Sequence, residues 1–361
     1  MMAGNISTPM LVEVSEAQVS DLGKLFENSE FPAIDIDQAL VYSLPLVNRF
    51  RRIIVREGVL LRSGNRWGEF APFWDYGPHE SKRWLWSAVN ALTEPEPQIM
   101  RGSVPVNVTV PVVSPKRAAE IVEQSGGCRT AKVKVADRGT ELADDVERIK
   151  AVRSALEKQF GQDYRIRVDA NGVWSLAEAK AAIAALDEAA GGLEYVEQPC
   201  KSTEDLLELR AATSVPLAVD ELIRRSPDPL SDLPDGCADV MVVKIQPLGG
   251  VSAVIDLAKK AKQRGLEVVV SSAVDSAVGI GLGVRAAAAM ARLPHACGLA
   301  TSQLLKSDVS RQPWQVKDGQ LEVREVEINS DLISAPDNDN RRDLVNRWSQ
   351  RMRDVAEVAS R

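Results

Sequence analysis

The chain has 361 residues, of which 45% are hydrophobic and 26% are charged, and its formal net charge at pH 7 is −7. This composition is typical of a folded globular protein and argues against disorder, and the acidic balance offers no basic surface to a nucleic acid. No run of about 18 apolar residues could span a bilayer, and the start MMAGNISTPM lacks the features of a signal peptide. We therefore expect a cytoplasmic protein without nucleic-acid or membrane partners. The composition leaves the oligomeric state open.

The cysteines and histidines exclude several kinds of site. The two histidines are too few for a His-based metal site or a relay of imidazoles. The cysteines stand far apart in no paired spacing, so we expect them to be reduced and buried. Acid–base chemistry therefore falls to Lys, Asp or Glu. The cysteines are Cys128, Cys200, Cys237 and Cys297.

Residues 1–103 predict a separate α+β domain. They contain the strand-like segments RFRRIIVREGVLL and WGEFAPF, followed by the helical segment KRWLWSAVNAL. We expect this domain to cap the rest of the molecule.

Residues 104–305 alternate short β-branched strands with helical stretches. This alternation implies parallel strands joined by crossover helices, and eight such strands in about 200 residues predict a closed (β/α) barrel of the TIM type. The fifth crossover, SPDPLSDLPDG, is proline-rich and predicts a short or broken helix. The expected strands are 104–113, 130–135, 164–169, 193–197, 216–220, 239–244, 267–271 and, weakly, 295–300. The expected helices are 142–158, 175–190, 202–212, 250–264 and 279–292.

Residues 306–361 predict a C-terminal segment that returns to the capping domain. Asp318 and Gly319 give a hairpin signal. A polar linker, SAPDNDN, then leads into a terminal helix whose apolar stripe we expect to dock within the fold. The fold class is therefore α/β, a modified TIM-type barrel with an α+β cap built from the N-terminal region and the C-terminal tail. The stripe consists of Leu344, Trp348, Met352 and Val355.

Charged side chains end five consecutive strands of the predicted barrel. Active sites of such barrels lie at the C-terminal ends of the strands. One acid there is usually a solvated loop residue, but three clustered carboxylates repel by about 4 kcal/mol per pair at ~4 Å unless a cation lies between them. All-oxygen ligands suit Mg²⁺, with Mn²⁺ as an alternative ion. The proposed metal ligands are Asp169, Glu197 and Asp220, and the lysines at the same strand ends are Lys132, Lys134 and Lys244.

The lysines predict proton chemistry on a small-molecule carboxylate. Lys134 and Lys244 stand on strands either side of the three acids, so they could flank a substrate carboxylate. A buried lysine beside a cation has a lowered pKa and can act as a general base near neutral pH. This arrangement allows removal of a proton alpha to a carboxylate. Lys132 lies one layer deeper than Lys134 and is expected to tune it.

Three further residues are candidates for binding the substrate. Ser271 and Ser272 end the seventh strand and could donate to the substrate, although hydroxyls at such positions equally cap turns. Arg167 shares the face of Asp169 and could contact the substrate or its surroundings. A structural ion pair explains Arg167 equally well.

The order Lys-x-Lys, Asp, Glu, Asp, Lys resembles the muconate-lactonizing subgroup of the enolase superfamily, whose members use a Lys or His base with Mg²⁺. The wording AKVKV, RVDANGVW, YVEQPC, VDE, VVKIQPLGG and VVVSSAVDSAVGI is similar to the branch that forms o-succinylbenzoate for menaquinone, and WGEFAPF fits the capping domain. The resemblance implies a lyase that dehydrates 2-succinyl-6-hydroxy-2,4-cyclohexadiene-1-carboxylate. It also implies that Lys134 is the base, that Lys132 supports it, and that Lys244 stabilises the enediolate.

Other reactions stay open. N-succinylamino acid racemization needs the same two lysines. The sequence segments resemble those of muconate cycloisomerases less closely. Dipeptide epimerization is disfavoured because the last strand region, GLATSQLL, carries no Asp-x-Asp. From a different class, a metal-free Schiff-base aldolase would use Lys134 or Lys244 as its nucleophile. A non-catalytic barrel that only binds a ligand is the remaining alternative.

Overall fold

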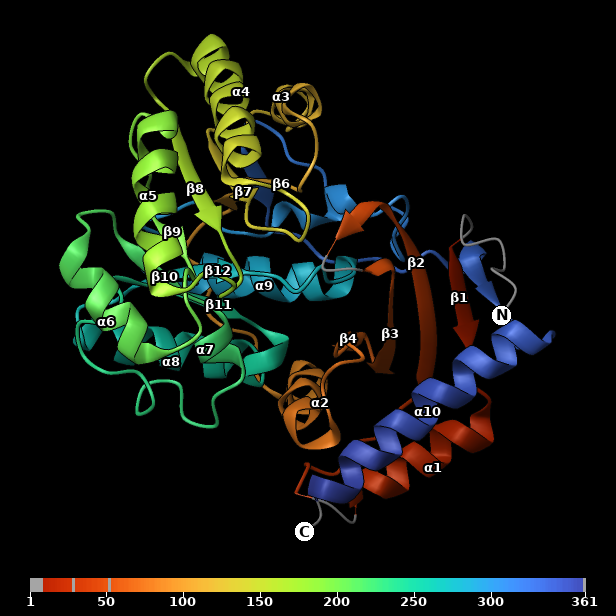
Figure 1. The fold of residues 1–361 in the computed structure, drawn as a ribbon. Coiled ribbons are helices and arrows are strands. Elements are labelled where there is room, and N and C mark those ends of the chain that lie inside the picture. Colours follow the sequence, from red (N-terminus) through yellow and green to blue (C-terminus); the bar gives the residue numbers. More distant parts are fainter. Residues whose placement is uncertain (1–8, 28–29, 51–52, 360–361) are drawn as a thin grey trace.

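A five-stranded capping sheet joins the two ends of the chain in the computed structural model, which describes residues 9–27, 30–50 and 53–359 (Figure 1). The strand from the C-terminal tail pairs in parallel with the first strand of the chain, and the remaining neighbours are antiparallel. The N-terminal region and the tail thus build one cap, as predicted. In sheet order the strands are β14 (Ile333–Ser334), β1 (Met10–Glu13), β2 (Gln38–Phe50), β3 (Ile53–Ser63) and β4 (Arg66–Phe70).

Three helices cover the cap, namely α1 (Glu16–Glu27), α2 (Pro78–Thr93) and α10 (Asp339–Ala359). The apolar stripe of α10 is buried against them as predicted, and Trp348 at its centre is 0% exposed. No described helix is both long and apolar enough to cross a membrane.

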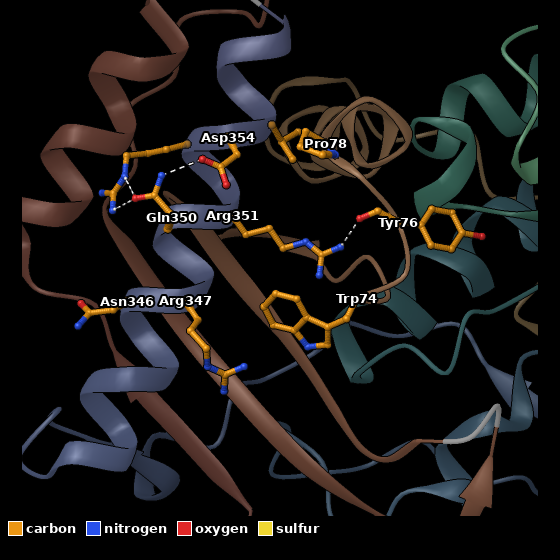
Figure 2. Close-up of a pocket in the computed structure, with 10 residues that line it drawn as sticks. Trp74, Tyr76, Pro78, Asn346, Arg347, Gln350, Arg351 and Asp354 are labelled. Carbon is orange, nitrogen blue, oxygen red and sulfur yellow. Dashed lines mark hydrogen bonds between the residues drawn. The ribbon is translucent and has the colours of Figure 1, made fainter. Parts of the chain in front are cut away.

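The helix α10 also fixes the loop that follows β4 (Figure 2). Its Arg351 donates to the carbonyl oxygens of Phe73 at 2.6 Å and Tyr76 at 3.0 Å. The same guanidinium lies 4.5 Å from the ring centre of Trp74. The C-terminal helix therefore sets the conformation of a loop whose residues Phe73 and Trp74 line the cleft between cap and barrel.

Seven parallel strands form the curled sheet of the second unit, which agrees with the predicted modified barrel. The expected eighth strand, 295–300, is reduced to two parallel bridges, from Cys297 to Val106 and from Gly298 to Ser271. Backbone bonds from Cys297 N to Pro105 O at 2.7 Å and from Gly298 N to Val270 O at 2.8 Å complete this closure. The strands are β6 (Val108–Val110), β7 (Thr130–Lys134), β8 (Arg165–Asp169), β9 (Val196–Glu197), β10 (Leu217–Val219), β11 (Val240–Lys244) and β12 (Glu267–Ser271).

The crossover helices agree with the predicted ones to within about one turn. Only a single turn, α7, follows β10, as the proline-rich crossover predicted. The helix α3 was not predicted, although Ser114 caps it and Pro115 begins it, which is a common helix start. The four cysteines are buried and free, as predicted. The helices are α3 (Pro115–Glu123), α4 (Leu142–Phe160), α5 (Leu176–Ala190), α6 (Thr203–Ala212), α7 (Glu221–Arg224), α8 (Val251–Gln263) and α9 (Ala277–Ala289).

The hairpin signal near residue 318 is confirmed, but its strand joins the base of the barrel and not the cap. Asp318 and Gly319 both have positive φ, and Lys317 bridges to Gln320. The following strand, β13 (Gln320–Glu322), pairs with β5 (Ser103–Pro105). Since β5 precedes β6, this two-stranded sheet lies on the side opposite the C-terminal strand ends.

Buried carboxylates dock the cap onto α9 of the barrel. Glu69 of β4 is 0% exposed and accepts from Tyr42 Oη at 2.6 Å, Ser276 Oγ at 2.7 Å and Gly279 N at 2.7 Å. A carboxylate at the first turn of a helix interacts favourably with the free N–H groups there. Gly279 is required for this approach, since a Cβ at that position would lie 2.6 Å from Glu69 Oε2. The contact therefore orients the cap on the barrel.

Replacing Trp348 by Ala should destabilise the protein. The ring packs 6.1 Å from Phe70 and 5.0 Å from Trp74 between centres, so the substitution leaves a cavity in the cap. We expect a loss of about 3–5 kcal/mol in the free energy of unfolding, measured by chemical denaturation. Asn346→Ala, at an exposed position of the same helix, should change it by less than about 0.5 kcal/mol. An equal effect of both substitutions would contradict this packing.

Asp308 should make stability depend on pH. Its Oδ1 accepts from Ala277 N at 2.8 Å and from Val309 N at 2.7 Å, while burial raises its pKa from 3.8 to about 6. The native state then holds the proton more tightly than the unfolded chain, so the stabilising contribution is present at low pH and is lost as the pH rises from about 4 through about 6.

The substitution Asp308→Asn removes this titration while it keeps an acceptor oxygen. We expect the variant to exceed the parent in unfolding free energy by up to about 3 kcal/mol near pH 8 and by little near pH 4. Denaturation curves across this range provide the measurement, and Asp256→Asn at an exposed site is the control. A difference independent of pH would contradict the assignment.

Candidate active site

The charged strand ends meet in one pocket at the C-terminal edge of the sheet. The parallel register places Lys134 beside Asp169, and Asp169 beside Glu197. Lys132, Lys134, Asp169, Asp220 and Lys244 line the pocket, together with both predicted serines. Glu197 is 0% exposed and lies just beneath, against Lys132. The structure therefore brings together the three acids and the three lysines selected from the sequence.

Each carboxylate is paired with a lysine. Asp169 Oδ2 lies 2.5 Å from the Nζ atom of Lys134 and 2.8 Å from that of Lys132. The Nζ atom of Lys132 also lies 2.6 Å from Glu197, and Lys244 Nζ donates to Asp220 Oδ2 at 2.5 Å. Pairing of this kind compensates for the removal of several charges from water.

The pKa shifts show that the lysines are not equivalent. Burial disfavours the charged form of Lys132, but the charges of Asp169 and Glu197 outweigh it and raise the pKa of this lysine. Burial lowers the pKa of Lys244, and Asp220 offsets only part of that effect. The lowered pKa expected of a flanking lysine is therefore found for Lys244, whereas the neighbouring carboxylates raise the pKa of Lys132.

The carboxylates differ in the same way. Burial opposes the ionisation of Asp169, yet Lys132 and Lys134 hold its pKa well below the usual range. Burial and then the charge of Asp169 raise the pKa of Glu197 to about 7, with a further contribution from Asp220. Burial and the two acidic neighbours thus oppose the ionisation of Glu197 more strongly than Lys132 and Lys244 favour it.

The residues present fit a hard divalent cation by their chemistry. Glu197 Oε2 and Asp220 Oδ1 are buried and accept no well-directed hydrogen bond, although Lys132 Nζ lies 2.6 Å from the first and Arg224 Nε 3.4 Å from the second. A cation would relieve the carboxylate repulsion that contributes to the raised pKa of Glu197. Oxygen ligands of this kind are those that Mg²⁺ prefers. In the part of the chain that the structure describes, no three such side chains converge on a common point, since each carboxylate turns toward its lysine.

The predicted substrate-binding residues divide into two groups. Ser271 and Ser272 line the pocket, and Ser272 Oγ lies 2.6 Å from Thr301 Oγ1. Arg167 is 0% exposed, lies 2.6 Å from Glu194, and is not among the residues that line the pocket. This placement favours the structural ion pair for Arg167.

Asn171 and Phe50 are among the pocket residues that were not selected from the sequence. Asn171 accepts from Lys134 Nζ at 2.9 Å, and its backbone N donates to Asp169 Oδ1 at 3.0 Å. Its place in the loop signal Ala-Asn-Gly after a charged strand end could have identified it. Phe50, from β2 of the cap, has its ring centre 5.5 Å from Lys134 Nζ. No local pattern marks Phe50, because it reaches the pocket only through the docking of the cap.

A wider cleft leads from solvent to this pocket. It has a volume of about 700 Å³ and lies between Phe50 and Phe73 of the cap and Lys134 and Arg224 of the barrel. Phe50, Lys134 and Asn171 line both the cleft and the inner pocket. A small carboxylate entering between the two domains would therefore meet Lys134 where the cleft narrows.

Comparison with known proteins decides the family. A model of the enolase C-terminal domain-like family matches residues 115–327, and a model of the enolase N-terminal domain-like family matches residues 41–92. The chain belongs to the enolase superfamily. This finding confirms the resemblance deduced from the strand ends.

Two relatives make the assignment more specific. The o-succinylbenzoate synthase of Thermobifida fusca is 49% identical over 293 residues, which cover 81% of this chain and 89% of the relative. The o-succinylbenzoate synthase of Mycolicibacterium smegmatis is 47% identical over 294 residues, covering 81% and 88%. The chain is thus an enzyme of the o-succinylbenzoate synthase family, as predicted.

Solved structures support the fold. The L-Ala-D/L-Glu epimerase of Bacillus subtilis has a TM-score of 0.69 at 22% identity, covering 82% of this chain and 97% of that one. A muconate lactonizing enzyme of Pseudomonas fluorescens has a TM-score of 0.68 at 18% identity, covering 83% and 97%. At these identities the similarity shows the shared architecture and not the reaction.

Added Mg²⁺ should stabilise the protein through the carboxylates. At a concentration of 100 times Kd, a ligand that binds only the folded state contributes about 2.7 kcal/mol, which raises the melting temperature. We expect Asp220→Asn to remove most of this shift, and Glu208→Gln, on the exposed face of α6, to retain it. Thermal melts with and without Mg²⁺ provide the measurement. An equal shift in all three proteins would contradict binding at this cluster.

Proposed function

We propose that the chain dehydrates 2-succinyl-6-hydroxy-2,4-cyclohexadiene-1-carboxylate to o-succinylbenzoate, a step of menaquinone biosynthesis. The observation that carries the proposal is the placement of Lys134 and Lys244 on opposite sides of one charged pocket, on β7 and β11. The names of the relatives at 46–49% identity give the product, o-succinylbenzoate, and the sequence resemblance implies the substrate. We expect the enzyme to act in the cytoplasm on this small dicarboxylate.

Lys134 is the proposed base. Its neutral amine removes the proton alpha to the ring carboxylate, and the ammonium so formed returns a proton to the departing hydroxyl. One C–H and one C–O bond break, the ring becomes aromatic, and one water leaves. Lys134 lies where the cleft narrows, so its Nζ atom is the first of the lysine amines that an entering substrate meets.

Lys244 is proposed to stabilise the negative charge that develops on the carboxylate oxygens. An ammonium group aimed at developing charge in a buried site is worth far more than in water. Lys132, fixed between Asp169 and Glu197, keeps a second positive charge beneath Lys134.

A Mg²⁺ ion, with Mn²⁺ as an alternative, would be held by Asp169, Glu197 and Asp220 and would supply a Lewis acid for the carboxylate oxygens. It would also offset the repulsion between Glu197 and the neighbouring Asp169 and Asp220. The lysines would then be released from part of their pairing with the acids.

N-succinylamino acid racemization is the second candidate. It is favoured by the same opposed lysines, because removal of a proton from one face and its return from the other needs an amine on each side. The two reactions share proton abstraction at an alpha carbon and differ in the presence of a leaving hydroxyl.

Assays on the purified protein test both. We expect dehydration of the cyclohexadiene substrate, followed as the ring becomes aromatic, and a fall in kcat of about 10²–10⁴-fold or more for Lys134→Ala. The control is Lys150→Ala, at an exposed ion pair on α4. Turnover by the parent protein of N-succinyl amino acids alone would select racemization. Undiminished dehydration by Lys134→Ala would show that the base is another group.

A further inference from the structure

One wall of the inner pocket has a strained backbone. Val274 lies in the loop after β12 and lines the pocket together with Lys132 and Lys244. Its φ is +59°, which places a β-branched residue in the left-handed region. Valine rarely adopts this conformation, because its Cβ substituents clash with the backbone. Surrounding contacts must therefore hold it.

A side chain of the cap, Arg56, holds the backbone carbonyl of Val274 in place. Arg56, on β3, is 2% exposed, and its Nε donates to the backbone oxygen of Val274 at 3.1 Å. The other two guanidinium nitrogens donate to the carbonyl oxygens of Glu57 and Ala71 within the cap. The group also lies 4.5 Å from the ring centre of Phe73. Arg56 is therefore rigidly placed by the cap and directs one N–H at the barrel loop.

A second set of contacts holds the same loop on either side of Val274. Asp275 accepts from Ala273 N at 3.2 Å and from Gln246 Nε2 at 2.8 Å. The amide oxygen of Gln246 accepts in turn from Ala71 N at 3.0 Å. The carbonyl oxygen of Ala71 thus accepts from Arg56, and its N–H donates to Gln246, which in turn donates to Asp275. The conformation of the pocket wall depends on the end of β4 in the cap.

We propose that Arg56 is a positioning residue of the reaction. By holding the Val274 carbonyl, it keeps Ser272 to Val274 in the arrangement that shapes the pocket, so that docking of the cap is coupled to substrate binding. The proposal rests on the proposed function, since it takes this pocket as the place of the substrate. Because the loop carries a wall of the pocket and none of the lysines, the effect should fall on KM more than on kcat.

The first test compares Arg56→Met with the parent enzyme in the dehydration assay, well below the melting temperature of either. We expect KM to rise about tenfold, as the strained conformation becomes less populated, and kcat to change by less than about threefold. Arg56→Lys, which keeps a donor, should recover part of the affinity. The matched control is Arg101→Met, whose guanidinium also donates to two carbonyls, at Met290 and Ala291. It should keep the KM of the parent.

A double-mutant cycle shows whether Arg56 acts through the backbone of Val274. Glycine adopts positive φ without strain, so Arg56→Met should raise KM by less than about threefold when Val274→Gly is already present. The same tenfold rise in both backgrounds would overturn the proposal. So would an Arg56→Met variant that has a lower melting temperature but an unchanged KM.

Hydrogen exchange separates this proposal from the proposed function, because it needs no substrate. In Arg56→Met, the amides of Ala273 and Val274 should exchange faster than in the parent, while those of β11 keep their rates. Unchanged exchange rates at both amides would show that Arg56 does not hold this loop, even if the enzyme is active. Absence of dehydration by the parent protein, with faster exchange in the variant, would instead overturn the substrate assignment alone.

Discussion

The array of ion pairs at the C-terminal strand ends is the constraint on which the rest of the structure depends. Asp169 lies between the ammonium groups of Lys132 and Lys134, and Lys132 also meets Glu197. Burying these charges costs several kcal/mol per ion unless each is paired. Their parallel strands must therefore keep one register, since a slip of a single residue would turn every charge to the other face. The fold brings the charged groups together, and the cost of burying an unpaired charge restricts the strands to this register.

The same array explains why similar groups take different roles. Burial and unequal pairing separate the pKa of Glu197 from that of Asp169, and the pKa of Lys244 from that of Lys132. Burial and neighbouring charges, and not residue type, thus set the pKa of each group in the site. The repulsion between Glu197 and its acidic neighbours is the feature that a bound metal ion would relieve.

Much of the barrel and its charged site could be predicted from the sequence, because both depend on local patterns. The alternation of strands and helices specifies the barrel, and acids or lysines at consecutive strand ends must meet at one edge. The predicted eighth strand near Cys297 is longer than the observed one, because two isolated bridges close the sheet there. Contributions from the cap could not be predicted, because Phe50 and Arg56 reach the barrel only through tertiary docking. The strain at Val274 depends on the same docking and leaves no mark in the sequence.

We propose that Asp169, Glu197 and Asp220 together hold one divalent cation in a pocket flanked by Lys134 and Lys244. Anomalous diffraction from crystals grown with Mn²⁺ and o-succinylbenzoate tests it most directly. We expect a single strong anomalous peak in contact with an oxygen of each of the three carboxylates and with the product carboxylate. An enzyme that is active in the crystal and shows no peak there, or a peak bound elsewhere, would contradict it.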